Sequence, residues 1–151
     1  MKQRIVSENY TVANGPALNN SRDKLYTVET VGNSHRVKGI YRYSIIKKGC
    51  VANEELFIPW VFDTYPDGVF TDNYDNLWIG EFGGNVVRKF SNEGELKLEI
   101  PLPAWNVTKG VFCKTQNRMF ITSARLKCNE EILKRYPQTG GILMVEGLVH
   151  C

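Results

Sequence analysis

The sequence contains no long apolar run and no basic tract, and these absences argue against several classes of protein. No stretch approaches the ~20 apolar residues that a membrane-spanning helix needs. The basic residues of the N-terminal MKQR are followed by no apolar segment of the kind a signal peptide carries. The formal charge is only +3, and no Lys/Arg run exceeds Lys47-Lys48, so nucleic acid is not an expected partner. A cytoplasmic protein without a membrane partner is expected.

Cysteine and histidine are scarce, which limits the metal and nucleophile chemistry available. The chain has four cysteines and two histidines. They are Cys50, Cys113, Cys128, Cys151, His35 and His150. Without a C-x-x-C pair, a zinc site of the usual spacing is absent, and free thiols are predicted. Neither histidine lies beside a plausible nucleophile motif, which argues against a Ser-His-Asp hydrolase.

A repeat organises the chain, whose 151 residues, 42% hydrophobic and 23% charged, suit one globular domain. Three units each begin with a Gly-containing strand pattern, turn on polar residues and continue with an aromatic or β-branched strand. The units open at Asn14, Asp67 and Lys109, which are 53 and 42 positions apart. A repeat of roughly 40–50 residues with up to four strands is the period of a propeller blade. We therefore predict an all-β fold of about three blades.

One short helix is expected as an insertion in the last blade, near residues 129–136. Asn129 can cap its first turn, acidic residues follow the cap, and Lys134 and Arg135 lie in its last turn. Pro137 comes directly after this end.

Both ends of the chain indicate an incomplete ring. Residues 3–7, QRIVS, are expected to form the outermost strand of a preceding blade, and the third unit lacks an outermost strand. Three blades cannot close a ring, since propellers typically have four to eight. An open arc leaves strand edges that invite pairing or aggregation. The expectation is that residues 1–151 are half of a propeller domain.

A family resemblance is carried by NGPALNNSRDKLYTVET, by PDGVFTDNYDNLWIGEFGGNVVRKFSNEGEL, and by VTKGVFCKTQNRMFITSAR followed by YPQTGGILMVEGL. Together these segments resemble the senescence marker protein, gluconolactonase and luciferin-regenerating enzyme family, the regucalcin-like proteins, roughly from Val6 to Leu148. The resemblance implies the C-terminal half of a six-bladed β-propeller with a divalent cation on its axis. It also implies metal-dependent hydrolysis of a sugar lactone of the gluconolactone type.

The resemblance places two metal ligands in this chain. The Asn of the family's NG(P/L)A motif falls on Asn14 and the Asp of its PDG motif on Asp67. Asp67 is also expected to be the catalytic base, and the metal to be Ca²⁺, Mn²⁺, Zn²⁺ or Mg²⁺. The family's Glu ligand and its substrate-contacting Arg and Asn have no counterpart here. Glu29 stands where relatives usually carry Asp, which we interpret as a local structural substitution.

The residue chemistry agrees with such a site. Innermost strands converge on a propeller axis, so residues that open successive blades can meet there, and amide and carboxylate oxygens are ligands that hard cations prefer. Two ligands of one Ca²⁺ lie within about 5 Å of each other, which sets the expected separation of the Asn14 and Asp67 oxygens. The alternative is that both residues only form turns, as Asn-Gly and Asp-Gly commonly do. Lys109 is interpreted as a rim residue.

Two functions are compatible with these residues. The first is a lactone hydrolase that is incomplete, and therefore weak or inactive, as residues 1–151 alone. The second is a non-catalytic arc that completes its ring with the missing N-terminal half or a second copy of itself, or that binds protein partners.

Overall fold

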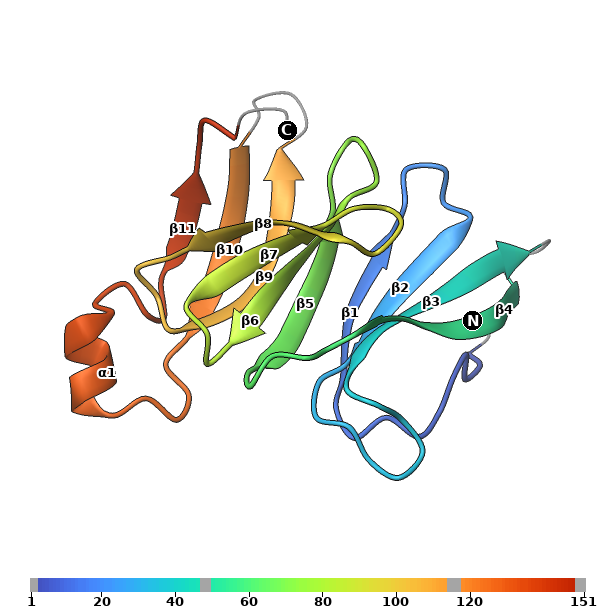
Figure 1. The fold of residues 1–151 in the computed structure, drawn as a ribbon, viewed down its shortest axis with the longest axis horizontal. Coiled ribbons are helices and arrows are strands. Elements are labelled where there is room, and N and C mark those ends of the chain that lie inside the picture. Colours follow the sequence, from blue (N-terminus) through green and yellow to red (C-terminus); the bar gives the residue numbers. More distant parts are fainter. Residues whose placement is uncertain (1–2, 47–49, 114–117, 149–151) are drawn as a thin grey trace.

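Three antiparallel sheets make up nearly all of the structure, a computed structural model that describes residues 3–46, 50–113 and 118–148. They follow one another in chain order across the molecule (Figure 1). Within the described ranges the elements are β1 (Ala13–Leu18), β2 (Lys24–Glu29), β3 (Gly39–Ile46), β4 (Cys50–Pro59), β5 (Tyr65–Thr71), β6 (Leu77–Phe82), β7 (Val86–Phe90), β8 (Leu96–Pro101), β9 (Asn106–Cys113), β10 (Arg118–Ala124), α1 (Glu130–Arg135) and β11 (Ile142–Val145).

The strand order is that of consecutive propeller blades. The first sheet is ordered β1-β2-β3-β4, the second β5-β6-β7-β8, and the third β11-β10-β9. The innermost strands β1, β5 and β9 contact one another in that order. The predicted all-β fold of three blades is therefore confirmed, and the third blade has three strands within the described residues.

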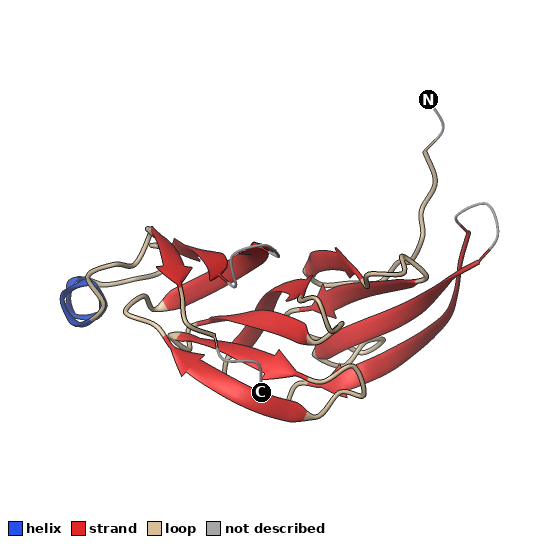
Figure 2. Ribbon diagram, turned by 90° about the horizontal axis from the view of Figure 1, so that it is seen from above, coloured by secondary structure: helices blue, strands red, loops and turns tan. Residues whose placement is uncertain are grey.

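Two hydrophobic clusters hold the blades together. The first joins the first and second sheets and includes Val28, Ile40 and Val69, while the second joins the second and third sheets and includes Trp78 and Val107. Val28 and Ile40 are paired across the ladder and therefore share a face. Burial of one such side chain contributes about 1.5–3 kcal/mol, so these interfaces dominate the stability of the arc. Figure 2 shows the twist of the strands and the position of α1 at one edge.

Each innermost strand is irregular near the residue that opens its unit. Residues 15–16 of β1 oppose a single residue of β2, and residues 67–68 of β5 oppose a single residue of β6. Residues 108–109 of β9 do the same against β10. Such a β-bulge breaks the ladder and redirects side chains. The three bulges lie on strands that contact one another, β1 with β5 and β5 with β9.

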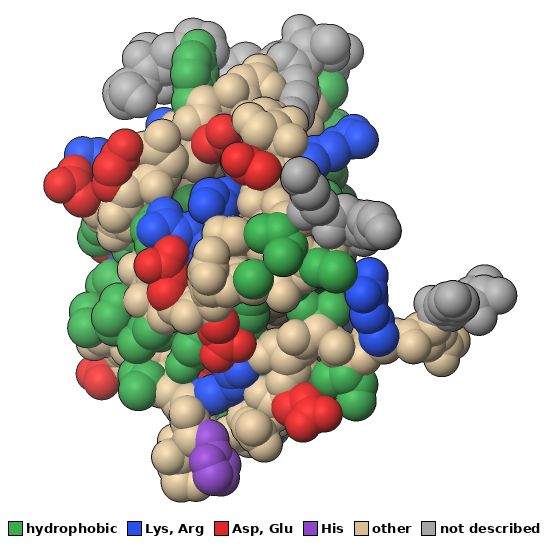
Figure 3. Space-filling view, turned by 90° about the vertical axis from the view of Figure 1, so that its right-hand side faces the viewer, with side chains coloured by type: hydrophobic (Ala, Val, Ile, Leu, Met, Phe, Trp, Pro, Cys, Tyr) green, Lys and Arg blue, Asp and Glu red, His purple; other side chains and the backbone are tan. Residues whose placement is uncertain are grey.

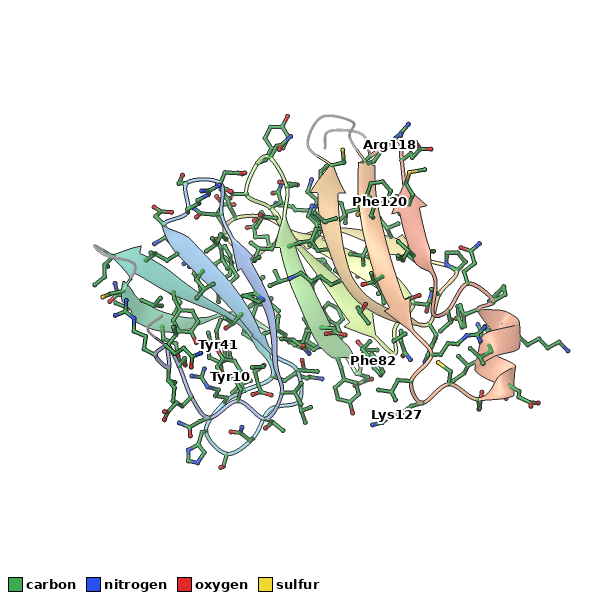
Figure 4. All side chains as sticks on the ribbon, turned by 180° about the vertical axis from the view of Figure 1, so that it is seen from behind. Tyr10, Tyr41, Phe82, Arg118, Phe120 and Lys127 are labelled. Carbon is green, nitrogen blue, oxygen red and sulfur yellow. The ribbon has the colours of Figure 1, made fainter. Side chains whose placement is uncertain are left out.

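The N-terminal segment does not form the strand that the sequence predicted for residues 3–7. The buried guanidinium of Arg36 donates a hydrogen bond of 2.6 Å to the hydroxyl of Ser7 and lies 4.1 Å from the ring centre of Tyr10. Tyr10 lies beside Tyr41 of β3, with ring centres 6.1 Å apart (Figure 4). The prediction is wrong because no described strand pairs with residues 3–6, which are exposed and extend away from the first sheet (Figure 2). Side-chain contacts hold the chain on this sheet only from Ser7 onward.

The helix prediction is confirmed. Helix α1 lies between β10 and β11, and the side chain of Asn129 accepts a hydrogen bond of 2.9 Å from the backbone N–H of Ile132. Glu130 and Glu131 occupy its first turn, in the orientation that the helix dipole favours.

The two outward faces of the arc differ in chemistry. Figure 3 views the side formed by the first sheet, where acidic, basic and other polar groups interrupt the apolar ones. On the third sheet, Val111, Phe120, Ile142 and Met144 share one face by register and are 39–76% exposed. These four residues are called the outer apolar face below. Figure 4 labels Phe120 on this sheet.

Two further features of the structure concern the cysteines and the helix. Cys50 and Cys128 are free thiols, as predicted, and Cys151 lies outside the described residues. Across the described ranges, no helix has the length and apolar character needed to cross a membrane.

Candidate functional site

Asn14 lies near the start of β1, directly before the bulge at residues 15–16. Its side-chain nitrogen donates a hydrogen bond of 2.8 Å to the hydroxyl of Thr30, a buried residue just beyond β2. This bond orients the amide, and among the described residues no donor bonds to the amide oxygen, which is available as an acceptor. An oriented amide oxygen is a suitable ligand for a hard cation.

Asp67 lies in the bulge of β5, on the strand that packs against β1. Burial raises the pKa of its carboxyl to about 6, although the positive charge of Lys109 acts in the opposite direction. No residue in the described part of the chain donates a hydrogen bond to this carboxylate. A carboxylate held away from water without a donor is electrostatically unsatisfied, and a nearby cation would stabilise its charged form.

Lys109 is not the rim residue that the sequence suggested. Its half-buried side chain extends from the bulge of β9, and its ammonium donates hydrogen bonds to the carbonyls of Gly15 (3.1 Å), Pro16 (3.0 Å) and Val69 (3.2 Å). Burial lowers the pKa of Lys109, and the charge of Asp67 partly offsets this effect. One side chain therefore links all three innermost strands.

Both predicted site residues thus lie on innermost strands that contact each other, and Lys109 reaches the same region from the third. Their joint binding of one cation stays a prediction. Among the described residues, no cluster of three or more His, Cys, Asp or Glu side chains could hold a metal ion. Asn14 and Asp67 therefore fit a divalent cation in ligand type, but they supply only two side-chain ligands.

Glu29 has the local structural role that was expected for it. The side chain is fully buried, and its carboxylate accepts hydrogen bonds from the backbone N–H groups of Thr11, Val12, Val31 and Gly32 at 2.7–3.4 Å. Burial alone would raise the pKa of Glu29, but the N–H groups of these four residues outweigh it and lower the pKa. Glu29 therefore holds the loop after β2 in place through hydrogen bonds and is not a third metal ligand.

Glu81, at the corresponding place in the second blade, is also buried and also fully engaged. It accepts a hydrogen bond from the hydroxyl of Thr64 and forms an ion pair of 2.5 Å with Arg88.

Two open surface hollows, of about 540 and 470 Å³, lie beside the third sheet, and neither is lined by Asn14 or Asp67.

Comparison with known proteins decides the family. Residues 1–125 match the family described as the SMP-30/Gluconolactonase/LRE-like region. The chain belongs to this family. A regucalcin from Gallus gallus is 33% identical over 88 residues, which are 57% of this chain and 29% of that protein.

Solved structures agree with this assignment to the SMP-30/gluconolactonase family. A calcium-binding regucalcin from Agrobacterium tumefaciens matches 90% of this chain and 46% of its own, with a TM-score of 0.79 at 19% identity. A gluconolactonase from Xanthomonas campestris matches 76% of this chain and 36% of its own, with a TM-score of 0.64 at 28% identity. The fold is thus that of a partial β-propeller. The chain spans less than half the length of each of these three proteins.

Proposed function

We propose that this chain supplies part of the active site of a divalent-metal-dependent sugar lactone hydrolase. On this proposal, residues 1–151 are the C-terminal half of the family's propeller domain. Family membership supports the reaction class, and the names of two relatives, a gluconolactonase and a calcium-binding regucalcin, indicate a lactone substrate and a divalent cation. The observation that carries the proposal is the position of Asn14 and Asp67 on contacting innermost strands, β1 and β5.

Each proposed ligand has a defined task. The oriented amide oxygen of Asn14 and the carboxylate of Asp67 would hold Ca²⁺, Mn²⁺, Zn²⁺ or Mg²⁺. When bound, the cation would polarise the lactone carbonyl and make a water more acidic. Asp67 would orient that water and accept its proton on the carboxylate.

The proposal makes the chain alone a poor catalyst, because it supplies two side-chain ligands and roughly half of the pocket wall. Losing an outer partner of a metal ligand typically costs 10–100-fold in affinity or activity, and losing a carboxylate ligand should cost at least as much. We place this reaction in the cytoplasm.

A gluconolactone hydrolysis assay tests this function. The chain is assayed with and without a polypeptide that carries the N-terminal half of the domain, in Ca²⁺, Mn²⁺, Mg²⁺ and Zn²⁺. Turnover is expected only in the mixture, only with added cation, and not with Asp67→Ala. Robust turnover by the lone chain that persists in Asp67→Ala would contradict both the incomplete site and the role of Asp67.

The second candidate is a non-catalytic arc that completes its ring with another chain. The outer apolar face favours it. Inside the arc, the apolar face of one sheet is covered by the next sheet, so four exposed apolar side chains on one face of the third sheet form a surface that a further blade would cover. Ring completion without lactone turnover in any metal would support this candidate.

A further inference from the structure

The side chain of Lys109 lies between the neighbours of both proposed metal ligands. Its stem runs over Gly68, the residue after Asp67: a Cβ placed on Gly68 would lie 2.4 Å from Cβ of Lys109. Its ammonium lies 3.1 Å from the carbonyl oxygen of Gly15, the residue after Asn14. The absence of a side chain at Gly68 therefore provides the space in which this lysine crosses from β9 to β1.

The ammonium is held in a fixed position. A lysine ammonium carries three donors and no acceptor. Here the ammonium donates to three carbonyls, those of Gly15 and Pro16 on β1 and of Val69 on β5. With its donors engaged, the group has none left for a substrate, and it acts on its surroundings through its charge.

That charge acts on the proposed cation site. Lys109 packs against Gly68, next to Asp67, and its ammonium contacts the carbonyl of Gly15, next to Asn14, so the charge lies close to both proposed ligands. A divalent cation bound by Asn14 and Asp67 would be repelled by the same ammonium, and in a partly buried site this repulsion is weakly screened.

We propose that Lys109 is a built-in cation at the axis that sets the affinity of the Asn14/Asp67 site for divalent cations. It partly satisfies Asp67 when no metal is bound and lowers the affinity for Ca²⁺ or Mn²⁺. This inference rests on the proposed metal site and adds a residue to it that limits occupancy. A divalent cation must therefore bind against a resident positive charge.

The test is calorimetric titration of the full chain with CaCl₂ or MnCl₂ alone. Lys109→Gln removes the charge and keeps donor groups, and Lys109→Arg keeps the charge. Lys97→Gln is the matched control, because Lys97 is an exposed lysine of β8 paired with Glu95. Lys109→Gln should bind the cation about 10- to 100-fold more tightly than the unmodified chain, the range seen for groups beside metal ligands. Lys109→Arg and Lys97→Gln should stay within a few-fold of it.

If Lys109 only stabilised the fold, the result would differ. Lys109→Gln and Lys109→Arg would then both leave the affinity for the cation unchanged or weaken it, and any weakening would accompany a lower melting temperature of the chain. Either result overturns the inference.

A further variant, Asp67→Asn, distinguishes failure of this inference from failure of the proposed function. If Asp67→Asn abolishes binding in the unmodified chain while Lys109→Gln leaves affinity unchanged, the metal site stands and the inference fails. If the Lys109→Gln gain survives Asp67→Asn, the cation binds elsewhere and the proposed site fails. Failure of Lys109→Gln to bind at all contradicts the inference.

Discussion

At the scale of single residues, the carboxyl of Asp67 links site chemistry to stability. Its pKa is raised from 3.8 to about 6 in the folded chain. A raised folded-state pKa means that the folded chain binds its proton more tightly than the unfolded chain does. The resulting stabilisation is complete below pH 4 and is lost as pH rises through about 6.

Asp67→Asn should remove this pH dependence. Relative to the unmodified chain, the variant should gain about 1 kcal/mol in the free energy of unfolding at pH 8 in the absence of metal, after discounting for partial exposure. It should gain nothing at pH 4. Urea unfolding at the two pH values measures the difference, with Asp63→Asn, an exposed residue of the loop before β5, as control. An equal effect of Asp67→Asn at both pH values would show that Asp67 is not desolvated.

The sequence predicted Asn14 and Asp67 because Asn-Gly opens the first unit, Asp-Gly opens the second, and both pairs match family motifs. It did not predict the contacts of Lys109. A lysine that opens a strand usually reaches solvent, and only the approach of β1 and β5 brings carbonyl acceptors within its reach.

At the scale of elements, buried carboxylates secure the loops that frame the site. Glu29 ends β2 and binds four backbone N–H groups of the loop after β2 and of the N-terminal segment. Glu29→Gln keeps the shape but removes the charge and one acceptor oxygen. We expect a loss of about 1–3 kcal/mol in the free energy of unfolding.

Amide hydrogen exchange locates the effect of Glu29→Gln. The amides of Thr11, Val31 and Gly32 should lose protection, while those of β10 should keep theirs. Glu55→Gln is the control, since Glu55 is an exposed residue of β4 whose ion pair with Arg42 contributes little. Unchanged protection at Val31 and Gly32 would refute this role.

Strand and helix positions were largely predictable. Aromatic and β-branched runs between polar turns marked β2, β6 and β10, and the Asn129 cap marked α1. The strand prediction for residues 3–7 was wrong because QRIVS has a strand-like pattern, but a strand also needs a neighbour to pair with, and no described strand pairs with these residues.

At the scale of the whole molecule, the arc is open and its ends are unlike. Residues 7–12 cover one side of the first sheet, whereas the outer apolar face of the third sheet is exposed. Exposed apolar sheet faces promote association. Sedimentation should therefore find the chain self-associated at micromolar concentration, and Phe120→Ser with Met144→Ser should shift it toward monomer.

The control for this association removes two apolar side chains elsewhere. Val37→Ser with Val61→Ser changes residues that are 58% and 81% exposed and lie outside the strands. This variant should associate like the unmodified chain. A monomeric unmodified chain, or equal loss of association in both variants, would contradict the role of the outer apolar face.

The central claim is that Asn14 and Asp67 hold one divalent cation where β1 and β5 meet. Paramagnetic broadening by Mn²⁺ in the amide NMR spectrum of the chain tests it most directly. At substoichiometric Mn²⁺, the side-chain amide of Asn14 and the backbone amides of Gly15 and Gly68 should broaden first, and Asp67→Ala should abolish this pattern. First broadening in the exposed acidic turn at Glu93 and Glu95, unchanged by Asp67→Ala, would show that the cation binds elsewhere.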